Sequence, residues 1–335
     1  MTSQTPETPE AEFKINLSDQ VACIEMPEKI TILEAVAFKT TFQELLVVTP
    51  GPEKIVLNFT NNTFIDSSGI GALVTNLKAA NKKGLELLLK NVHPQVMAVF
   101  VMNGLDQVLD IQTQAKKTNK SVNNPQESQP PATHPSTSSW VKRLIDIVGG
   151  LVGLIITGFL LIPIVIAIKL DSPGPIFFAQ TRHGWLGKKF KIWKFRSMCI
   201  DAEELKSKIE NKASGAFFKN ENDPRITKVG SFLRKTSLDE LPQFWNVVKG
   251  EMSLVGTRPP TSDEVDHYDI PEWQRFDVKP GMTGEWQTNG RSQIREFEDV
   301  IKMDLRYQKN WSLVYDIKLI LKTILILFRK NSGAV

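Results

Sequence analysis

Cysteine and histidine are scarce in this chain of 335 residues, and their spacing excludes several kinds of site. The two cysteines, Cys23 and Cys199, lie far apart, so they indicate neither a disulfide framework nor a metal cluster, and a reducing cytosol fits best. The histidines are scattered without metal-ligand spacing: His93, His134, His183 and His267. A zinc hydrolase is therefore not credible.

Arginine is missing from the N-terminal part, because Arg143 is the first in the chain. That part cannot offer a guanidinium to a phosphate. The formal net charge is only +4, but from Asp171 to Lys235 basic residues outnumber acidic ones about two to one. This excess predicts an anionic partner or a membrane surface. Residues 1–12 are polar and acidic without an apolar core, which argues against a cleaved signal peptide.

The chain contains no internal repeat and changes composition twice. Residues 1–12 are expected to be disordered, and residues 13–111 show the alternating strand and helix patterns of an α/β domain. Residues 112–139 are rich in polar residues and proline and have almost no aliphatic side chains. They predict a flexible linker, because such a segment cannot bury enough apolar surface to become ordered.

The α/β region has four clear element patterns. Strands are predicted at Ile55–Phe59 and Leu85–Leu89, and helices at Gly69–Lys82 and Pro94–Met102. At the start of the first of these helices, the side chain of Asp66, Ser67 or Ser68 would be an ordinary helix N-cap.

Ile147–Ile168 is an uncharged apolar run of about 22 residues, which is enough to span a bilayer. Length alone favours one transmembrane helix. Positive charge flanks both ends, however, and this suits a segment whose two ends are both cytoplasmic. Pro163 lies inside the run, where it removes a helix hydrogen bond. We therefore expect a re-entrant membrane helix over residues 140–170 that bends at Pro163 and returns to the same face.

A second apolar segment lies near the C-terminus. Residues 314–330 are mostly Leu and Ile with interspersed Lys and Arg. An interfacial helix with snorkelling lysines and a core-packing helix fit this pattern equally well. Residues 331–335 are expected to form a short tail.

Thr236–Trp245 reads as the start of a helix. Ser237 and Glu240 have the spacing of a capping box, and Pro242 falls near the first turn. An Asp–Glu pair at such a place is usually only favourable charge at the positive end of the helix dipole. The same position would keep Asp239 ionised beside backbone N–H groups that can bind phosphate oxygens.

Several strings of the C-terminal part resemble the bacterial sugar transferases, which are monotopic polyprenyl-phosphate phosphoglycosyl transferases. They occur in the order of that family, between Trp140 and Arg329: Lys194–Met198, Arg234–Gly256, Arg258–Pro259, Lys279–Gly284 and Asn289–Arg291. The resemblance implies an α-rich, membrane-associated catalytic domain over residues 171–330, with interfacial helices and a re-entrant helix hairpin.

By the same resemblance, Asp239 is the nucleophile and Glu240 its partner, and both would be ligands of Mg²⁺. The implied reaction transfers a sugar-1-phosphate from a UDP-sugar to polyprenyl (undecaprenyl) phosphate and releases UMP, through an aspartyl phospho-sugar. A carboxylate nucleophile divides one displacement into two, and Mg²⁺ and arginines offset charge on the phosphoryl group. The family uses this reaction as the first membrane step of exopolysaccharide or glycoconjugate synthesis. Glucose, galactose and N-acetylated sugars are all compatible with the sequence.

The resemblance also implies a set of phosphate-binding residues. Its members are Arg234, Arg258, Pro259 and Arg291, with Lys194 and Arg196 as weaker candidates. A planar guanidinium matches two phosphate oxygens at once, although each of these residues taken singly is more often a surface residue.

Two positions depart from the family pattern. Thr257 stands where the family usually has proline, so we expect a looser turn before Arg258. Glu285 and Trp286 follow Gly284, where an aromatic or small apolar residue is commoner at the first position.

The N-terminal region resembles STAS domains of the anti-sigma-factor antagonist type. The resemblance rests on Phe64–Gly71, Asn91–Pro94 and Asn103–Leu105, and it implies a regulatory domain over residues 13–111 with a mixed sheet and helices. In that family a partner kinase can phosphorylate the serine that corresponds to Ser67. A phosphate there would place about two negative charges at a helix N-terminus. Without the resemblance, the same residues are only a helix N-cap.

The implied partners are a UDP-sugar, polyprenyl phosphate, membrane lipids and a cytosolic protein or kinase for the STAS domain. A homodimer is compatible with the sequence, and no nucleic acid is expected. Because both domains need cytosolic partners, we expect a monotopic protein of the inner (cytoplasmic) membrane with both domains on its cytoplasmic face. A sulfate transporter is excluded, because the chain has a single long apolar run.

Two rival functions predict different products. A catalytically degenerate protein that only tethers a STAS module to the membrane would release no UMP from a UDP-sugar. A glycosyltransferase that moves the sugar without its phosphate would release UDP. The presence of Asp239, Glu240 and the arginines argues against the first rival.

Overall fold

The computed structural model describes residues 13–18, 20–112, 130–205, 209, 220, 223–289 and 296–327. The described residues form two compact units. The N-terminal unit takes its residues from Met1–Thr133, Leu186–Lys188 and Tyr268–Asp277, and the C-terminal unit takes the others. The expected boundaries are therefore too simple, because two pieces of residues 171–330 pack in the N-terminal unit. The expected disordered start and C-terminal tail lie outside the described residues.

The N-terminal unit contains the predicted mixed sheet. Its five strands lie in the order β1-β2-β4-β6-β7, with β1 and β2 antiparallel and the other neighbours parallel. A short parallel pair, β3 and β5, lies apart from it. The strands are β1 (Lys14–Ser18), β2 (Val21–Glu25), β3 (Lys29–Ile30), β4 (Lys54–Asn58), β5 (Phe64–Ile65), β6 (Glu86–Lys90) and β7 (Asp110–Gln112).

The two central strands are apolar on both faces. Ile55, Val56 and Leu57 are buried along β4, and Val56 lies opposite Leu88 of β6. Strands with parallel neighbours are usually covered on both faces, so they read as continuous apolar runs without alternation. Both predicted strands are confirmed, with bounds shifted by about one residue.

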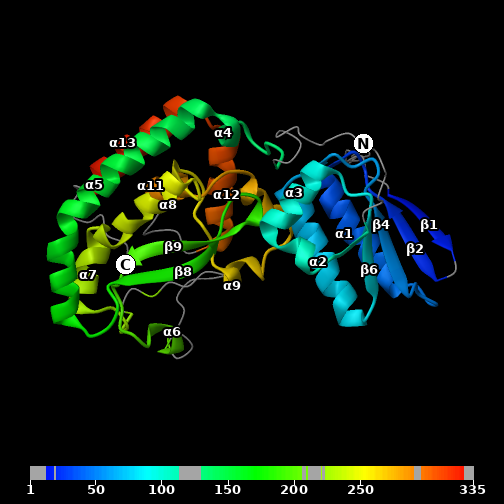
Figure 1. The fold of residues 1–335 in the computed structure, drawn as a ribbon, viewed down its shortest axis with the longest axis horizontal. Helices are drawn as coiled ribbons and strands as arrows, with labels where there is room; N and C mark the ends of the chain where they lie inside the picture. The colour runs from blue at the N-terminus through cyan, green and yellow to red at the C-terminus, as the bar shows by residue number, and fades with distance from the viewer. Residues whose placement is uncertain are drawn as a thin grey trace, which may run out of the picture. The chain divides into compact units, whose positions relative to one another are not determined.

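Helices of the N-terminal unit gather on one side of the strands (Figure 1). They are α1 (Ile32–Val47), α2 (Ser67–Lys83), α3 (Pro94–Asn103) and η1 (Leu105–Gln107), joined by α10 (Ile270–Trp273) and η5 (Gln274–Asp277) from late in the chain. The expected N-cap of α2 is present, because Asp66 accepts a hydrogen bond from the Gly69 N–H at 2.9 Å. Gly84, at φ 69°, ends this helix in the left-handed region.

The C-terminal unit is mainly helical and contains two small sheets. Its helices are α4 (Pro135–Ser138), α5 (Trp140–Asp171), α6 (Ala202–Leu205), α7 (Lys228–Lys235), η4 (Leu238–Gln243), α8 (Phe244–Lys249), α9 (Ser262–Val265), α11 (Glu285–Asn289), α12 (Phe297–Lys309) and α13 (Leu313–Leu327). The strands are β8 (Phe177–His183) with β9 (Lys189–Phe195), antiparallel, and β10 (Ser253–Val255) with β11 (Gly281–Thr283), parallel. The short helix η2 (Trp185–Gly187) follows β8.

The predicted linker is wrong at its C-terminal end. Residues 113–129 lie outside the described residues, but α4 forms within the expected linker and its Ser136 is buried. The His134 ring nitrogen Nε2 lies 3.1 Å from the carbonyl oxygen of Gln308. Proline at the first helical position and a side-chain cap from His134 explain why this polar segment becomes helical.

The long helix α5 contains the predicted apolar run. It is the one helix among the described residues that is long and apolar enough to cross a membrane. The expected hairpin is not formed as two helices joined by a turn, because α5 is helical throughout and Pro163 lies inside it. The helix bends along its length (Figure 1). A proline that lacks one helical hydrogen bond can bend a helix without ending it.

Both ends of α5 are bound to the C-terminal unit. At the first end, the Lys142 ammonium pairs with the Asp316 carboxylate at 2.6 Å, and both side chains are almost fully buried. At the other end, Arg196 donates hydrogen bonds to the carbonyl oxygens of Ser172 and Pro173. The whole helix therefore lies against one folded body.

Small residues allow α5 to approach α8 closely. A Cβ atom on Gly153 would overlap the ring of Phe244, and one on Gly150 would lie 2.8 Å from a Val248 methyl group. The opposite face of the helix is apolar and exposed: Leu144, Val148, Leu151, Val152, Ile155, Ile156, Phe159, Ile162, Ile166 and Leu170. Exposed apolar patches of this size mark membrane or protein contacts.

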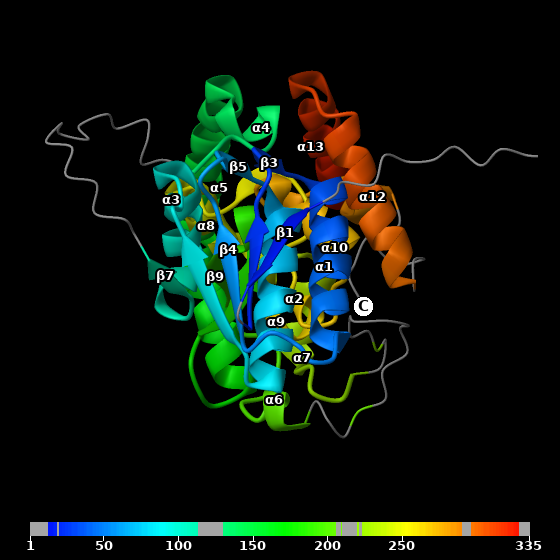
Figure 2. The same ribbon diagram turned by 90° about the vertical axis from the view of Figure 1, so that its right-hand side faces the viewer.

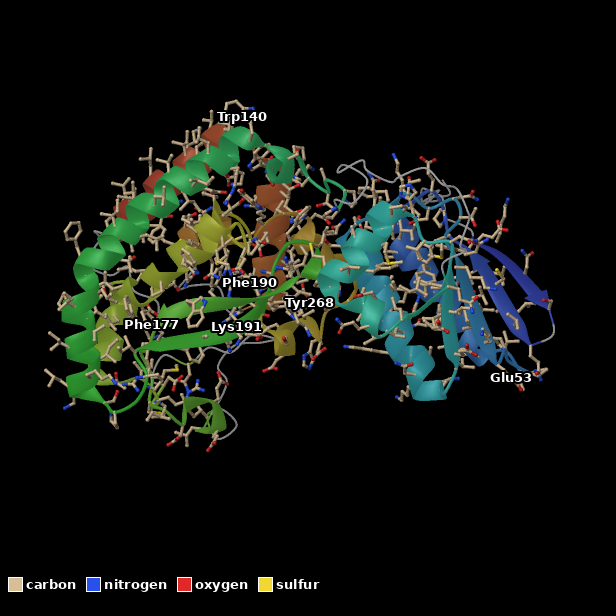
Figure 3. The ribbon with its side chains drawn as sticks, in the orientation of Figure 1. Glu53, Trp140, Phe177, Phe190, Lys191 and Tyr268 are labelled. Carbon is tan, nitrogen blue, oxygen red and sulfur yellow. The ribbon has the colours of Figure 1, made fainter. Side chains whose placement is uncertain are left out.

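The C-terminal helix α13 has a similar division. Asp316 and Leu319 are buried, whereas Val314, Ile317 and Leu321 are exposed. Figures 1 and 2 show α13 and α5 at the same edge of the C-terminal unit, and Figure 3 marks Trp140 at the start of α5. The exposure of the apolar positions favours the interfacial helix over the core-packing one.

The close contact between α5 and α8 can be tested with two glycines of the same helix. Gly153→Ala should destabilise the C-terminal unit by about 1–3 kcal/mol, because its methyl group overpacks the Phe244 contact. Gly158→Ala meets no atom within 4 Å and should stabilise the helix by about 0.5–1 kcal/mol. Thermal unfolding in detergent compares the two variants, and equal midpoints would contradict the packing.

Candidate active site

The short helix η4 carries the two candidate catalytic carboxylates. Asp239 and Glu240 lie in the first turn of this helix, whose N-cap residue is Ser237. Asp239 is buried, with 6% of its surface exposed, whereas the Glu240 side chain is 23% exposed. One carboxylate is thus enclosed by the fold, and its neighbour reaches toward solvent.

The predicted helix start is confirmed, but the capping box is wrong. Ser237 adopts a left-handed conformation with φ 56°, and its side chain makes no cap hydrogen bond. The Glu240 carboxylate accepts a hydrogen bond from the Lys194 ammonium on β9 at 3.0 Å. Ser237 therefore does not cap the helix with its side chain, and Glu240 pairs with Lys194.

Lys194 and Arg196 are neighbours on the chain but have different partners. Lys194 pairs with Glu240, which places a cation beside the carboxylates. Arg196 is buried and donates to the backbone that follows α5. These contacts give Lys194 a place in the site and Arg196 a role in holding the end of α5.

Arg234 lies in the last turn of α7, just before η4. Asp223 and Arg225 form a buried ion pair, in which a guanidinium nitrogen and a carboxylate oxygen lie 2.7 Å apart. The positive charge of Arg234 also acts on Asp223. Burial acts to raise the pKa of Asp223, but hydrogen bonds from Arg225 and the charges of Arg225 and Arg234 outweigh it and lower that pKa. The sequence analysis did not predict Arg225 as part of this region. An aspartate two residues before an arginine, as in Asp223 and Arg225, can indicate a local ion pair.

Arg258 is oriented by a buried acid. Its two terminal nitrogens donate to the Glu264 carboxylate at 2.7 and 3.0 Å, and its guanidinium lies 5.8 Å from the centre of the Trp286 ring. A guanidinium has five N–H donors. Two of them bind Glu264, and this pairing fixes the orientation of the guanidinium plane. Glu264 and Trp286 were not predicted as site residues.

Arg182 is a second arginine at this place and was missed. It donates to the Pro259 carbonyl oxygen at 3.0 Å and to the Gln180 side chain at 2.7 Å. Burial, and next the charge of Arg258, lower the pKa of Arg182 to about 10. Two guanidinium groups close enough to affect each other favour an anion at this place.

The two late motifs lie side by side. The Gly256 N–H donates to the Thr283 carbonyl oxygen at 2.9 Å, and the Gly281 N–H donates to that of Thr257 at 2.8 Å. The backbones approach so closely that a Cβ on Gly256 would overlap the Lys279 carbonyl oxygen. Thr257 is buried. The looser turn expected before Arg258 stays a prediction, because the Gly256 N–H and the carbonyl oxygen of residue 257 would make these bonds with proline as well.

Two predicted residues need separate mention. Arg291 lies outside the described residues. Ser67 is fully buried at the start of α2, and its N–H donates to the Asp277 carboxylate at 3.1 Å. Ser67 belongs to the N-terminal unit, whereas the carboxylates of η4 belong to the C-terminal unit.

The described residues include no group of three acidic, histidine or cysteine side chains that could enclose a metal. Mg²⁺ commonly uses only one or two carboxylates, together with substrate phosphates and water. Asp239 and Glu240, which are consecutive in the sequence, could supply two such carboxylates.

The role of Glu264 in orienting Arg258 gives a direct test. Glu264→Gln should weaken binding of UMP by about tenfold, roughly the value of one charge-assisted hydrogen bond. Asp263→Asn, at the exposed neighbouring residue, should leave the affinity unchanged. Isothermal titration calorimetry of the full chain in detergent measures both. Equal affinities for Glu264→Gln and the natural chain would contradict the orienting role.

Comparison with known families gives two matches. The family described as bacterial sugar transferase matches residues 137–330, and the STAS domain family matches residues 12–122. A solved structure of the Bacillus cell fate determinant SpoIIAA in its phosphorylated form aligns with 31% of this chain and 93% of that chain, at 18% identity and a TM-score of 0.27.

Several curated relatives match a little over half of this chain, and three of them are as follows. Galactosyl transferase CpsE of Streptococcus agalactiae is 50% identical over 185 residues, 55% of this chain and 41% of that protein. The UDP-glucose:undecaprenyl-phosphate glucose-1-phosphate transferase of Escherichia coli is 43% identical over 191 residues, which are 55% of this chain and 39% of that protein. Exopolysaccharide production protein ExoY of Rhizobium meliloti is 37% identical over 189 residues, which are 55% of this chain and 83% of that protein.

The chain thus spans about two fifths of the length of the first two relatives. The family match, by contrast, covers more than half of the chain and contains η4 and the arginines around it. This protein therefore belongs to the bacterial sugar transferase family and carries a STAS domain before it.

Proposed function

We propose that this protein transfers a sugar-1-phosphate from a UDP-sugar to undecaprenyl phosphate and releases UMP. The observation that carries the proposal is the position of η4. Leu238 and Leu241, which flank the two carboxylates in sequence, pack against a cluster that contains Ile164 and Ile168 of α5. The carboxylates thus lie on an element that contacts the apolar helix. A site of this kind suits a substrate that combines a long lipid chain with a phosphate.

The reaction proceeds in two displacements at one phosphorus atom. A carboxylate oxygen of Asp239 attacks the phosphorus that bears the sugar, the bond to the bridging oxygen breaks, and UMP leaves. A phosphate oxygen of undecaprenyl phosphate then attacks the same phosphorus and breaks its bond to Asp239. The product is undecaprenyl diphosphate sugar, and the carboxylate is regenerated.

Fixed cations support both steps. Lys194 pairs with the carboxylate of Glu240, the residue that follows Asp239. Arg258, oriented by Glu264, and Arg234 at the end of α7 can bind the phosphate oxygens. Asp239 and Glu240 would hold Mg²⁺ together with the diphosphate, and this ion would supply further positive charge against the transferring group.

We propose that α5 enters and leaves the membrane by the same face. Its first turn pairs with Asp316 and its last turn is held by Arg196, and both partners belong to the same polar unit. A straight crossing would drag part of that unit into the lipid. The exposed apolar positions of α5 and α13 give the protein a membrane-facing surface. Both units would then lie on the cytoplasmic face, where UDP-sugars are available.

The class of product follows from the chemistry of the relatives. One relative's name specifies UDP-glucose and undecaprenyl phosphate, another specifies galactosyl transfer, and a third specifies exopolysaccharide production. We propose that this protein performs the corresponding first membrane step for an exopolysaccharide or glycoconjugate. A screen of UDP-sugars with undecaprenyl phosphate, with UMP as the measured product, identifies the sugar.

The proposed nucleophile can be tested by substitution. Asp239→Asn should lower UMP release by roughly a thousandfold or more, because a carboxamide cannot form the covalent intermediate. Asp299→Asn, on the exposed face of α12, should retain the natural rate. Chromatography separates UMP from UDP after incubation of the full chain with a UDP-sugar and undecaprenyl phosphate.

Each rival function has its own outcome in that assay. UDP as the product would assign the protein to sugar transfer without phosphate. Turnover of Asp239→Asn at the natural rate would remove the covalent mechanism. Absence of both nucleotides with every UDP-sugar would support a membrane tether for the STAS domain.

A further inference from the structure

A ten-residue segment of the sugar transferase match is built into the STAS unit. Tyr268–Asp277 lies within residues 137–330 of the family match, yet it packs in the N-terminal unit. Ile270, Trp273 and Phe276 of this segment are buried, with at most 7% of their surface exposed. The segment forms α10 and η5, which contact α2 and α1 of the STAS domain. The N-terminal unit is therefore completed by residues that another family supplies.

The segment docks on the first turns of α2. The Trp273 indole lies on Gly71 so closely that a Cβ there would come within 2.5 Å of the ring. The Asp277 carboxylate accepts the Ser67 N–H at 3.1 Å, which satisfies one of the free N–H groups at the start of the helix. At the other end of the segment, the Asp269 carboxylate pairs with Lys39 of α1 at 2.8 Å.

The docked segment crowds two carboxyl groups around Ser67. Burial is the main cause that raises the pKa of Asp66 to about 6. Burial, and next the charge of Asp66, raise the pKa of Asp277 to about 7. Glu34 of α1 adds further negative potential at Asp66. Raised pKa values mean that this place disfavours the negative charge it already has. An additional anion on the fully buried Ser67 would be desolvated and would meet the carboxyl groups of Asp66 and Asp277.

We propose that the face of the STAS domain around Ser67 is a docking site for the chain's own segment Tyr268–Asp277, and that a negative charge on Ser67 expels this segment. The docked state and a charged Ser67 exclude each other. Burial by the segment hides the Ser67 hydroxyl, and a charge on that hydroxyl would face the carboxylates of Asp66 and Asp277.

The connections of the segment link this event to the sugar transferase sequence. Toward the N-terminus, the chain leads back to α9 and the pair of Glu264 and Arg258. Toward the C-terminus, Asp277 is followed after three residues by β11, which pairs with β10. Release of the segment would remove an anchor from both motifs at once. A charge on Ser67 would therefore affect the two transferase motifs that directly precede and follow the segment in the chain.

Hydrogen exchange with mass spectrometry on the full chain in detergent tests the proposal. Ser67→Asp should make amide exchange in Tyr268–Asp277 at least about tenfold faster, the equilibrium change that corresponds to one pKa unit. Ser67→Asn has nearly the same shape without the charge and should give a much smaller change. Peptides from β4 and β6 report in the same experiment whether the STAS sheet remains folded.

Two further variants keep the test decisive if Ser67→Asp disturbs the sheet. Gly71→Ala should release the segment without any charge, because its methyl group displaces the Trp273 ring. In the Asp277→Asn background, Ser67→Asp should have a smaller effect on the segment, because one of the opposing carboxylates is gone. Unchanged exchange of the segment in Gly71→Ala, or equal release by Ser67→Asp and Ser67→Asn with β4 and β6 protected, would overturn the proposal.

Discussion

The pairing of Lys142 with Asp316 determines much of the C-terminal unit. Asp316 also accepts hydrogen bonds from the Tyr307 hydroxyl at 2.8 Å and the Trp311 indole N–H at 3.2 Å, so one buried carboxylate joins α5, α12 and α13. Removing one partner of such a pair leaves a buried charge and costs about 3–5 kcal/mol. Because Arg196 holds the other end of α5, the apolar helix and the catalytic unit form one body. The η4 carboxylates then stand at a defined place beside the apolar helix.

Patterns that depend on neighbouring residues were read correctly from the sequence. The continuous apolar runs of β4 and β6 reflect burial on both faces, and the N-cap of α2 is local chemistry. The capping box failed because Ser237 takes a left-handed conformation and a distant strand supplies Lys194. Arg182 was missed for a similar reason, since its partner Pro259 follows 77 positions later and no spacing rule connects the two.

The boundary between the two units also depends on contacts between residues that are distant in the sequence. Tyr268–Asp277 has the composition of an ordinary amphipathic segment, and nothing in its periodicity states which folded body receives its aromatic side chains. The STAS sheet offers α2 with glycine at the contact, and the segment offers Trp273. Residues of the sugar transferase match thus form part of the core of the N-terminal unit.

The most direct test of the account is the sidedness of the two ends of α5. Single-cysteine variants Ser138→Cys and Ala179→Cys, made in a chain whose Cys23 and Cys199 are replaced by serine, place an exposed thiol before and after the helix. A membrane-impermeant maleimide is applied to intact spheroplasts and to inverted membrane vesicles. The account predicts that both thiols react only in inverted vesicles, where the cytoplasmic face is outward. Labelling of the two thiols from opposite sides would contradict it.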